Sequence, residues 1–293
     1  MSQPAPPPVE TEDLEWDLEI RASTGWFNLH LQDLWRYRDL LRMFVWRDFV
    51  AVYKQTILGP VWFFIQPLLT TATFTIIFSG VAKLSTDGLP PLLFYLAGTT
   101  PWNYFAAAIT KTSNTFVTNA NLFGKIYFPR LVTPLSAVIS TLIQFGIQFL
   151  LLLGMLAWYL FQGVPIHPDW GGILLLTPLL ILLLAGLGLG VGIIVSSLTT
   201  KYRDLTFLVN FGVQLAMYAT PVVYPLSMVP SKYRFWLELN PMTSIIEAFR
   251  SLYLGVGTFS WSGLGYSSLV VLVVLSAGVV IFNRVEKSFM DTV

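Results

Sequence analysis

Residues that could do acid–base, nucleophilic or metal chemistry are few and scattered in this sequence. It has no cysteine and two histidines, His30 and His167, which lie far apart. Disulfides, zinc–thiolate sites and iron–sulfur clusters are therefore excluded, and no metal site is predicted. No G-x-x-x-x-G-K-[ST] sequence occurs, since Gly124-Lys125 lacks the upstream glycine and the hydroxyl residue. We predict no catalytic residue, no cofactor bound by this chain and no ATP site within it.

One glycine run superficially resembles a dinucleotide-binding loop. Its members are Gly186, Gly188, Gly190 and Gly192, and their spacing differs from G-x-G-x-x-G. They lie within a long apolar segment, where glycines four residues apart share one helix face and let another helix approach closely. The run therefore predicts tight helix packing.

The elements around these residues must be membrane helices. The chain has 293 residues, of which 55% are hydrophobic and 11% are charged, against about 25% charged in soluble domains. A membrane-spanning helix needs about 20 mostly apolar residues, and six charge-free windows are long enough: 55–82, 88–110, 131–168, 170–200, 205–231 and 251–283. We therefore predict an all-α integral membrane protein with six transmembrane helices. A water-soluble enzyme does not fit this composition, and a net charge of +1 gives no field for nucleic acid.

The positions of the charged residues bear on ion coupling and on the orientation of the chain in the membrane. No acidic or basic side chain falls within a charge-free window, so the relay residue that ion-coupled pumps use is missing. With six spans, 13 Lys and Arg residues fall on the side that holds both termini and 4 fall on the other. By the positive-inside rule, both termini are expected in the cytoplasm.

The chain divides into three predicted regions. Residues 1–25 form a proline-rich acidic tail, expected to be disordered. Residues 26–54 carry apolar side chains at three-to-four spacing among arginines, which predicts one or two amphipathic helices in the cytoplasmic membrane interface. A soluble helix packed on its own protein is the alternative. Residues 55–293 are predicted to form the six-span transmembrane domain.

Aromatic side chains make up 15% of the chain. Their faces could stack on sugar rings in a saccharide conduit, whereas the Trp and Tyr belt at membrane interfaces is the ordinary explanation. The candidates for a conduit are Trp62, Phe63, Phe64, Tyr104, Phe105, Tyr218 and Tyr224.

The segment 221–250 is too polar to span a membrane and too apolar for a free loop. Asn240-Pro241 is a helix-start signal, and Glu247 and Arg250 can pair three residues apart on that helix. We predict a re-entrant helical hairpin between the fifth and sixth spans, with these four residues at the outer mouth of a pathway. An interfacial loop is the alternative.

Several motifs in order resemble the permease subunits of polysaccharide ABC exporters, those of O-antigen, capsule or teichoic acid. The sequence LFGKIYFPR at 122–130 resembles their cytoplasmic loop consensus N-L-I-x-K-x-x-F-P-R. The same family is matched by Gly59-Pro60 with Gln66-Pro67, Tyr202-Arg203-Asp204, TPVVYP at 220–225, Asn240-Pro-Met and EAFR at 247–250. The resemblance covers about residues 30–290.

That resemblance implies a bacterial inner-membrane homodimer with two copies of a cytoplasmic subunit that binds ATP and Mg. The substrate would be a polysaccharide linked to a lipid, commonly undecaprenyl diphosphate, and membrane lipid would surround the complex. A coupling helix within 114–129 would dock into the ATPase, and the resemblance assigns coupling to Asn121, Leu122, Phe123, Lys125, Tyr127, Phe128 and Arg130. The acidic tail and Phe123-Gly124 depart from the pattern.

Two alternatives stay open from the sequence. One is an ABC permease of the same class that moves a drug or a lipid. The other is an ion-coupled flippase or a membrane scaffold, neither of which would need a nucleotide-binding partner.

Overall fold

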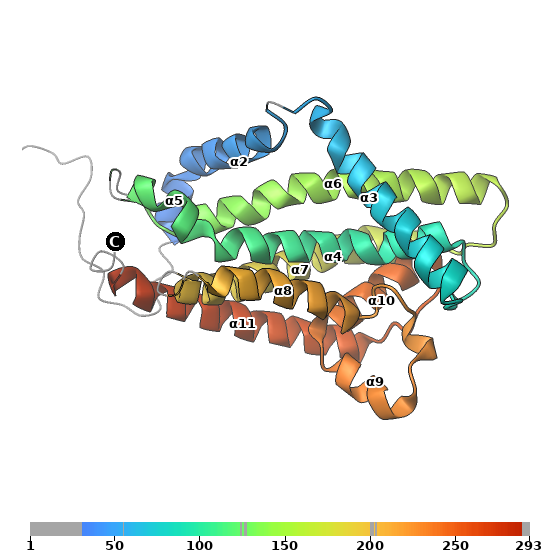
Figure 1. The fold of residues 1–293 in the computed structure, drawn as a ribbon. Coiled ribbons are helices and arrows are strands. Elements are labelled where there is room, and N and C mark those ends of the chain that lie inside the picture. The colour runs from blue at the N-terminus through green and yellow to red at the C-terminus, as the bar shows by residue number, and fades with distance from the viewer. Residues whose placement is uncertain are drawn as a thin grey trace, which may run out of the picture.

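The computed structural model describes residues 31–288, except Gln55, Gly124, Ile126, Tyr127, Thr200, Lys201 and Arg203. All regular elements in these ranges are helices, and most run side by side in an elongated bundle (Figure 1). The predicted tail lies outside the described residues. The predicted all-α class is confirmed for the part of the chain that the structure describes.

Four helical segments are long and apolar enough to cross a membrane: Gly59–Val81, Val132–Phe161, Trp170–Thr199 and Trp261–Arg284. The first comprises η1 (Gly59–Val61), α3 (Trp62–Phe74) and the π-helical turn η2 (Thr75–Val81). The others are α6 (Val132–Phe161), α7 (Trp170–Thr199) and α11 (Trp261–Ser288). At 1.5 Å per residue, α6 and α7 are each about 45 Å long, more than the hydrocarbon thickness of about 30 Å.

The other two predicted spans differ from the expectation. The window 88–110 forms α4 (Pro91–Ser113), whose interior includes polar residues such as Thr99, Thr100 and Asn103, and it is not among the four apolar spans. Most of α4 is buried by neighbouring helices, so its side chains face protein. The window 205–231 forms only the 14-residue α8 (Leu205–Tyr218), because Pro221 and Pro225 follow it.

Glycines of α7 allow the closest helix contacts of the bundle, as the sequence predicted. A Cβ on Gly188 would lie 2.7 Å from the Cβ of Ala108 in α4, and one on Gly190 would lie 3.0 Å from the Cα of Leu275 in α11. The two glycine faces therefore seat two different helices, α4 and α11, against α7.

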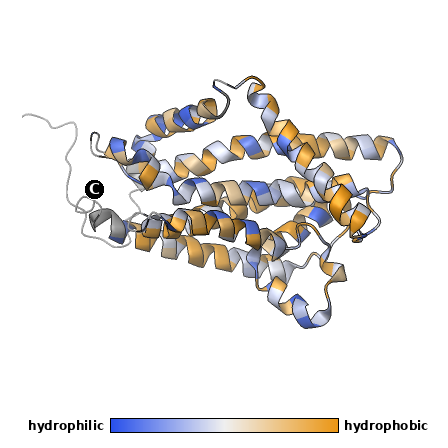
Figure 2. Ribbon diagram, viewed as in Figure 1, coloured by the Kyte–Doolittle hydropathy of each residue, from blue (hydrophilic) through white to orange (hydrophobic). Residues whose placement is uncertain are grey.

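The two ends of the bundle differ. At one end lie α1 (Leu31–Arg36), α2 (Arg38–Tyr53), α5 (Thr115–Phe123) and the end of α11 (Figure 1). At the other end lie η3 (Leu226–Met228), α9 (Ser231–Glu238) and α10 (Pro241–Leu254). Figure 2 shows hydrophilic residues on α2 and α9, with hydrophobic residues dominating α8 and α11. The helices expected within 26–54 and 221–250 are thus present at opposite ends.

Candidate functional site

A buried polar cluster surrounds Arg250 of α10, whose side chain is 1% exposed. One terminal nitrogen, Nη1, donates to the carbonyl oxygen of Pro221 at 2.7 Å, to that of Tyr224 at 3.4 Å and to Oε1 of Glu247 at 3.3 Å. The other, Nη2, donates to the carbonyl oxygen of Val222. The guanidinium carbon lies 3.9 Å from the ring centroid of Phe94 in α4. The predicted pair of Glu247 and Arg250 is confirmed.

Local sequence explains why α10 begins and ends where it does. The side chain of Asn240 accepts a hydrogen bond from the Met242 amide at 3.0 Å and donates to the Thr220 hydroxyl at 2.8 Å. Pro241 occupies the first turn, and Gly255 ends the helix in the left-handed conformation, with φ 71°. The predicted helix start at Asn240-Pro241 is therefore confirmed.

This cluster binds the irregular segment after α8 to α10. The carbonyl groups of Pro221, Val222 and Tyr224 lie in an irregular segment, and Arg250 supplies a hydrogen-bond donor to each of them. Gly98 of α4 permits the approach, because a Cβ there would lie 2.6 Å from the Val222 carbonyl oxygen. Both Glu247 and Arg250 are buried, and their predicted place at the outer mouth of a pathway stays a prediction.

The seven conduit candidates separate into two groups. Phe63, Tyr104 and Phe105 are buried in the chain's own core, and Tyr104 packs on Phe145 of α6 at a ring distance of 5.2 Å. The exposed candidates are Trp62, Phe64 and Tyr218, while Tyr224 is half-buried and its hydroxyl donates to the Tyr218 carbonyl at 3.1 Å. Only the exposed group is available to a molecule outside this chain.

A stripe of exposed side chains runs along α8, of which the sequence analysis identified only Tyr218. Phe207, Phe211, Gln214 and Tyr218 recur at four, three and four residues, so they share one helix face. All four are exposed, and α8 has no buried residue. We call these four residues the α8 stripe. Their helical spacing was the signal that could have identified it.

Pairs of neutral polar side chains join α4 to its neighbours. The Asn103 amide of α4 donates to the Gln148 side chain of α6 at 3.2 Å. Nearer the other end, Thr206 of α8 donates to the Asn114 side chain, which follows α4, at 3.1 Å. These pairs link α4 to α6 and to α8 without any formal charge.

The predicted coupling residues fall on two faces of α5 and on the loop after it. Phe123 and Phe128 are buried and stack on each other at 5.5 Å, with Phe44 of α2 and Phe282 of α11 in the same apolar cluster. Asn121 and Lys125 are exposed, Leu122 and Arg130 are half-buried, and Tyr127 lies outside the described residues. Phe123 is therefore a member of the protein's apolar interior, and the coupling role of this set stays a prediction.

The opposite face of α5 is the one left uncovered. Val117, Thr118 and Asn121 are exposed there, whereas Thr115, Phe116, Asn119 and Phe123 are buried. Arg47 of α2 donates to the Asn119 side chain at 3.2 Å, which fixes α5 against α2. Val117 and Thr118 were absent from the sequence-based candidates, although their helical spacing from Asn121 indicates a common face.

Long apolar helices joined by short polar ones define a multi-span membrane protein, with no cluster of three or more His, Cys, Asp or Glu side chains among its described residues. The chain belongs to the ABC-2 type transporter family, whose model matches residues 39–254. This confirms the resemblance drawn from the motifs.

Curated relatives match along most of their length. The chain is 30% identical to the "O-antigen export system permease protein RfbA" of Klebsiella pneumoniae, over 86% of this chain and 94% of the relative. It is 27% identical to the protein of the same name from Myxococcus xanthus, over 90% and 98%. It is 22% identical to the "Polysialic acid transport protein KpsM" of Escherichia coli, over 80% and 89%.

Proposed function

We propose that this chain is the permease subunit of an ABC exporter that moves a lipid-linked polysaccharide across the bacterial cytoplasmic membrane. The observation that carries the proposal is the match to polysaccharide export permeases over nearly their whole length. Within that class we propose O-antigen as the substrate type, which is the one named for the relatives from Klebsiella pneumoniae and Myxococcus xanthus.

We also propose that α4 and α8 complete six membrane crossings. Polar residues inside the membrane are tolerated where protein covers them, and the burial of α4 meets this condition. The 14 residues of α8 reach about 21 Å, and the segment 219–230, held by Arg250, would complete that crossing. In this topology α9 and α10 form a re-entrant hairpin at the outer end, while α1 and α2 lie in the cytoplasmic interface with both termini inside.

The substrate pathway is proposed to lie between two copies of the chain, along the α8 stripe. Two Phe, one Gln and one Tyr combine stacking faces with hydrogen-bonding groups, the chemistry that a sugar chain requires. Trp62 and Phe64 of α3 are exposed on another helix that packs against α4. The absence of charge from the stripe would let successive sugar units move without a strong fixed contact.

ATP and Mg are proposed to bind to a partner ATPase, present in two copies, because this sequence has no P-loop. The exposed face of α5, with Val117, Thr118 and Asn121, is its proposed docking surface, joined by Lys125. The buried members of the coupling set would instead hold α5 in position through the aromatic cluster.

The experiment is complementation of a deletion strain, with surface glycan and membrane abundance measured together. Wild type should restore the glycan and co-purify with an ATPase, and an uncoupler should not abolish export by the purified complex in vesicles. Replacing both Phe211 and Tyr218 with Ala should reduce export at least tenfold, at about 1 kcal/mol of stacking per aromatic ring. The matched control is Phe161→Ala, which removes an exposed aromatic side chain from α6.

Other outcomes would contradict this proposal. Normal surface glycan in the deletion strain, together with loss of drug or lipid efflux, would favour the alternative permease. Activity that collapses with the uncoupler and needs no ATPase would favour an ion-coupled flippase. Normal export by the double aromatic variant at normal abundance would remove the α8 stripe from the pathway.

A further inference from the structure

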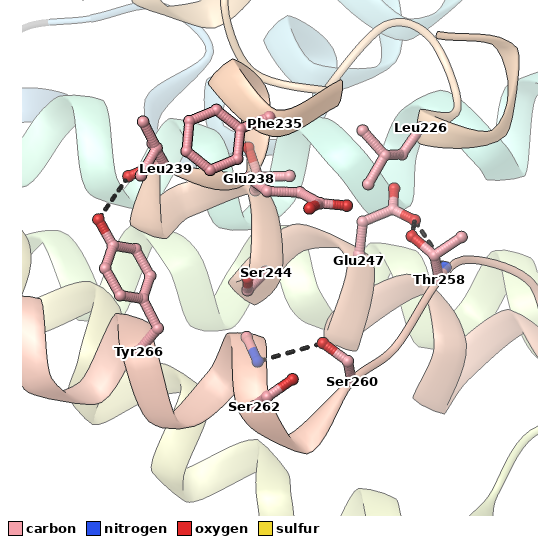
Figure 3. A pocket seen from close by; sticks show the side chains of 12 residues that line it. Leu226, Phe235, Glu238, Leu239, Ser244, Glu247, Thr258, Ser260, Ser262 and Tyr266 are labelled. Carbon is pink, nitrogen blue, oxygen red and sulfur yellow. Dashed lines mark hydrogen bonds between the residues drawn. The ribbon is translucent and has the colours of Figure 1, made fainter. Parts of the chain in front are cut away.

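A polar cavity of about 290 Å³ lies between α9, α10 and the start of α11 (Figure 3). It is near the lower limit for small-molecule sites, which is about 300 Å³, so it suits one ring-sized ligand. Phe235 and Tyr266 contribute aromatic rings, and Glu238 contributes a carboxylate that points into the cavity (Figure 3). We call this space the outer pocket.

Two hydroxyl groups of the outer pocket are available to a ligand. Ser244 of α10 and Ser262 of α11 line it, and neither hydroxyl has a hydrogen-bond partner among the described residues. Other polar groups there are already engaged: the Tyr266 hydroxyl donates to the Leu239 carbonyl at 3.0 Å, and Ser260 accepts from the Gly263 amide at 3.1 Å. These internal hydrogen bonds fix the shape of the pocket, while the hydroxyls of Ser244 and Ser262 remain available to bind a ligand.

The charge of the lining selects among ligands. Glu238 and Glu247 both line the outer pocket, and no Lys or Arg does. Glu247 is neutralised by Arg250 from within the protein, whereas Glu238 is paired with Arg234 along α9 on a partly exposed surface. Arg234 bonds Oε1 of Glu238, and the other oxygen, Oε2, can accept from hydroxyl or ammonium groups of a ligand, whereas a carboxylate or phosphate would find no Lys or Arg in the lining.

We propose that the outer pocket binds a single sugar unit that is neutral or carries an amino group. Its hydroxyls would bond to Glu238, Ser244 and Ser262, and its apolar face would lie against Phe235 or Tyr266. This assignment of a sugar site stands on the pocket itself; that the sugar belongs to the exported glycan rests on the proposed function. The pocket would then hold the glycan at the outer end of the protein.

The test measures sugar binding to the permease–ATPase complex in lipid nanodiscs, by saturation-transfer NMR. The probes are the methyl glycosides of glucose, glucosamine and glucuronic acid, together with a repeat-unit oligosaccharide from the strain's own surface glycan. The first two glycosides should bind, and the glucuronide should bind at least tenfold more weakly. The oligosaccharide should bind in the same pocket if the exported glycan is the source.

Variants at exposed positions keep the test separate from folding. Ser262→Phe should fill the pocket and abolish binding of every probe, and Glu238→Gln should weaken the glucosamine glycoside more than the glucose glycoside. The matched control is Ser231→Phe, an exposed serine of α9 outside the pocket, which should bind as wild type. Equal binding by wild type and Ser262→Phe, or tight binding of the glucuronide, would overturn the pocket proposal.

A lipid headgroup is the competing occupant. Displacement of bound phospholipid by glycerophosphoethanolamine, with no sugar binding at any concentration, would overturn the proposal in favour of that occupant. The two proposals fail separately. Normal glycan export with no sugar binding would refute the pocket alone, whereas pocket binding of the methyl glycosides in a protein that exports no glycan would refute the proposed function alone.

Discussion

Breaking the buried ion pair of Glu247 and Arg250 should destabilise the protein far more than breaking an exposed ion pair. Glu247→Ala leaves Arg250 at 1% exposure with a full positive charge and three backbone carbonyl partners. Removing one member of a buried ion pair costs about 3–5 kcal/mol. We therefore expect Glu247→Ala to lower the thermal unfolding midpoint by on the order of 10 °C, applying the scaling for soluble domains.

Arg250→Ala should be worse, because it also takes the donors from Pro221, Val222 and Tyr224. Each buried carbonyl left without a donor costs about 1–3 kcal/mol. Replacing both Glu247 and Arg250 with Ala removes the uncompensated charge and still leaves those carbonyls unpaired. The double variant should consequently stay well below wild type, and no more stable than Glu247→Ala.

The assay is intrinsic tryptophan fluorescence during heating of the purified complex in detergent, with membrane abundance as a second measurement. Asp39→Ala is the matched control: Asp39 and Arg42 have the same three-residue spacing and a distance of 3.2 Å, but their side chains are 74% and 78% exposed. It should change stability by less than about 1 kcal/mol. A double variant as stable as wild type would refute the role given to the three carbonyl groups.

Three further predictions concern topology, helix packing and coupling. A reporter fused after Val293 should read cytoplasmic and one inserted after Asp169 external; a cytoplasmic reading at Asp169 breaks the six-crossing topology. Gly192→Ala places a Cβ 2.5 Å from the Thr112 Cβ and should lower the free energy of unfolding by about 1–3 kcal/mol. Gly146→Ala, whose Cβ would have nothing within 4 Å, should raise it by about 0.5–1 kcal/mol. Thermal unfolding of both variants checks that the two effects have opposite signs. Val117→Asp should leave abundance normal and uncouple ATP hydrolysis from export, and unchanged coupling would move the docking surface off α5.

Charge-free windows predicted the long helices because each window had to exclude every charged side chain along its whole length. The boundaries of α6 and α7 fall within one residue of the windows' starts, at Val132 and Trp170. The windows do not predict which helix is buried at the centre of the bundle. The burial of α4 depends on contacts with α3, α6, α7, α8 and α10, and most of those contacts involve residues far apart in the sequence.

The candidate site was predictable where the signal is local. The cap at Asn240 and the pair of Glu247 and Arg250 each lie within four residues, and both are confirmed. Aromatic content was a poorer guide, because a Tyr or Phe serves equally in a core or on a pathway. Tyr104 and Phe123 proved to be core residues, and only their neighbours across space, Phe145 and Phe128, decide that.

The position of the buried charge bears on the proposed source of energy for export. A proton or cation relay requires an ionisable group that alternates between partner and pathway. Among the described residues, the ion pair with both side chains buried is that of Glu247 and Arg250. Both terminal nitrogens of its arginine donate to backbone carbonyls, so releasing it would take these donors from Pro221, Val222 and Tyr224. This charge is held in place by the structure, and the α8 stripe carries none, which supports the proposal that a partner ATPase, docked at the α5 end of the bundle, supplies the energy for export.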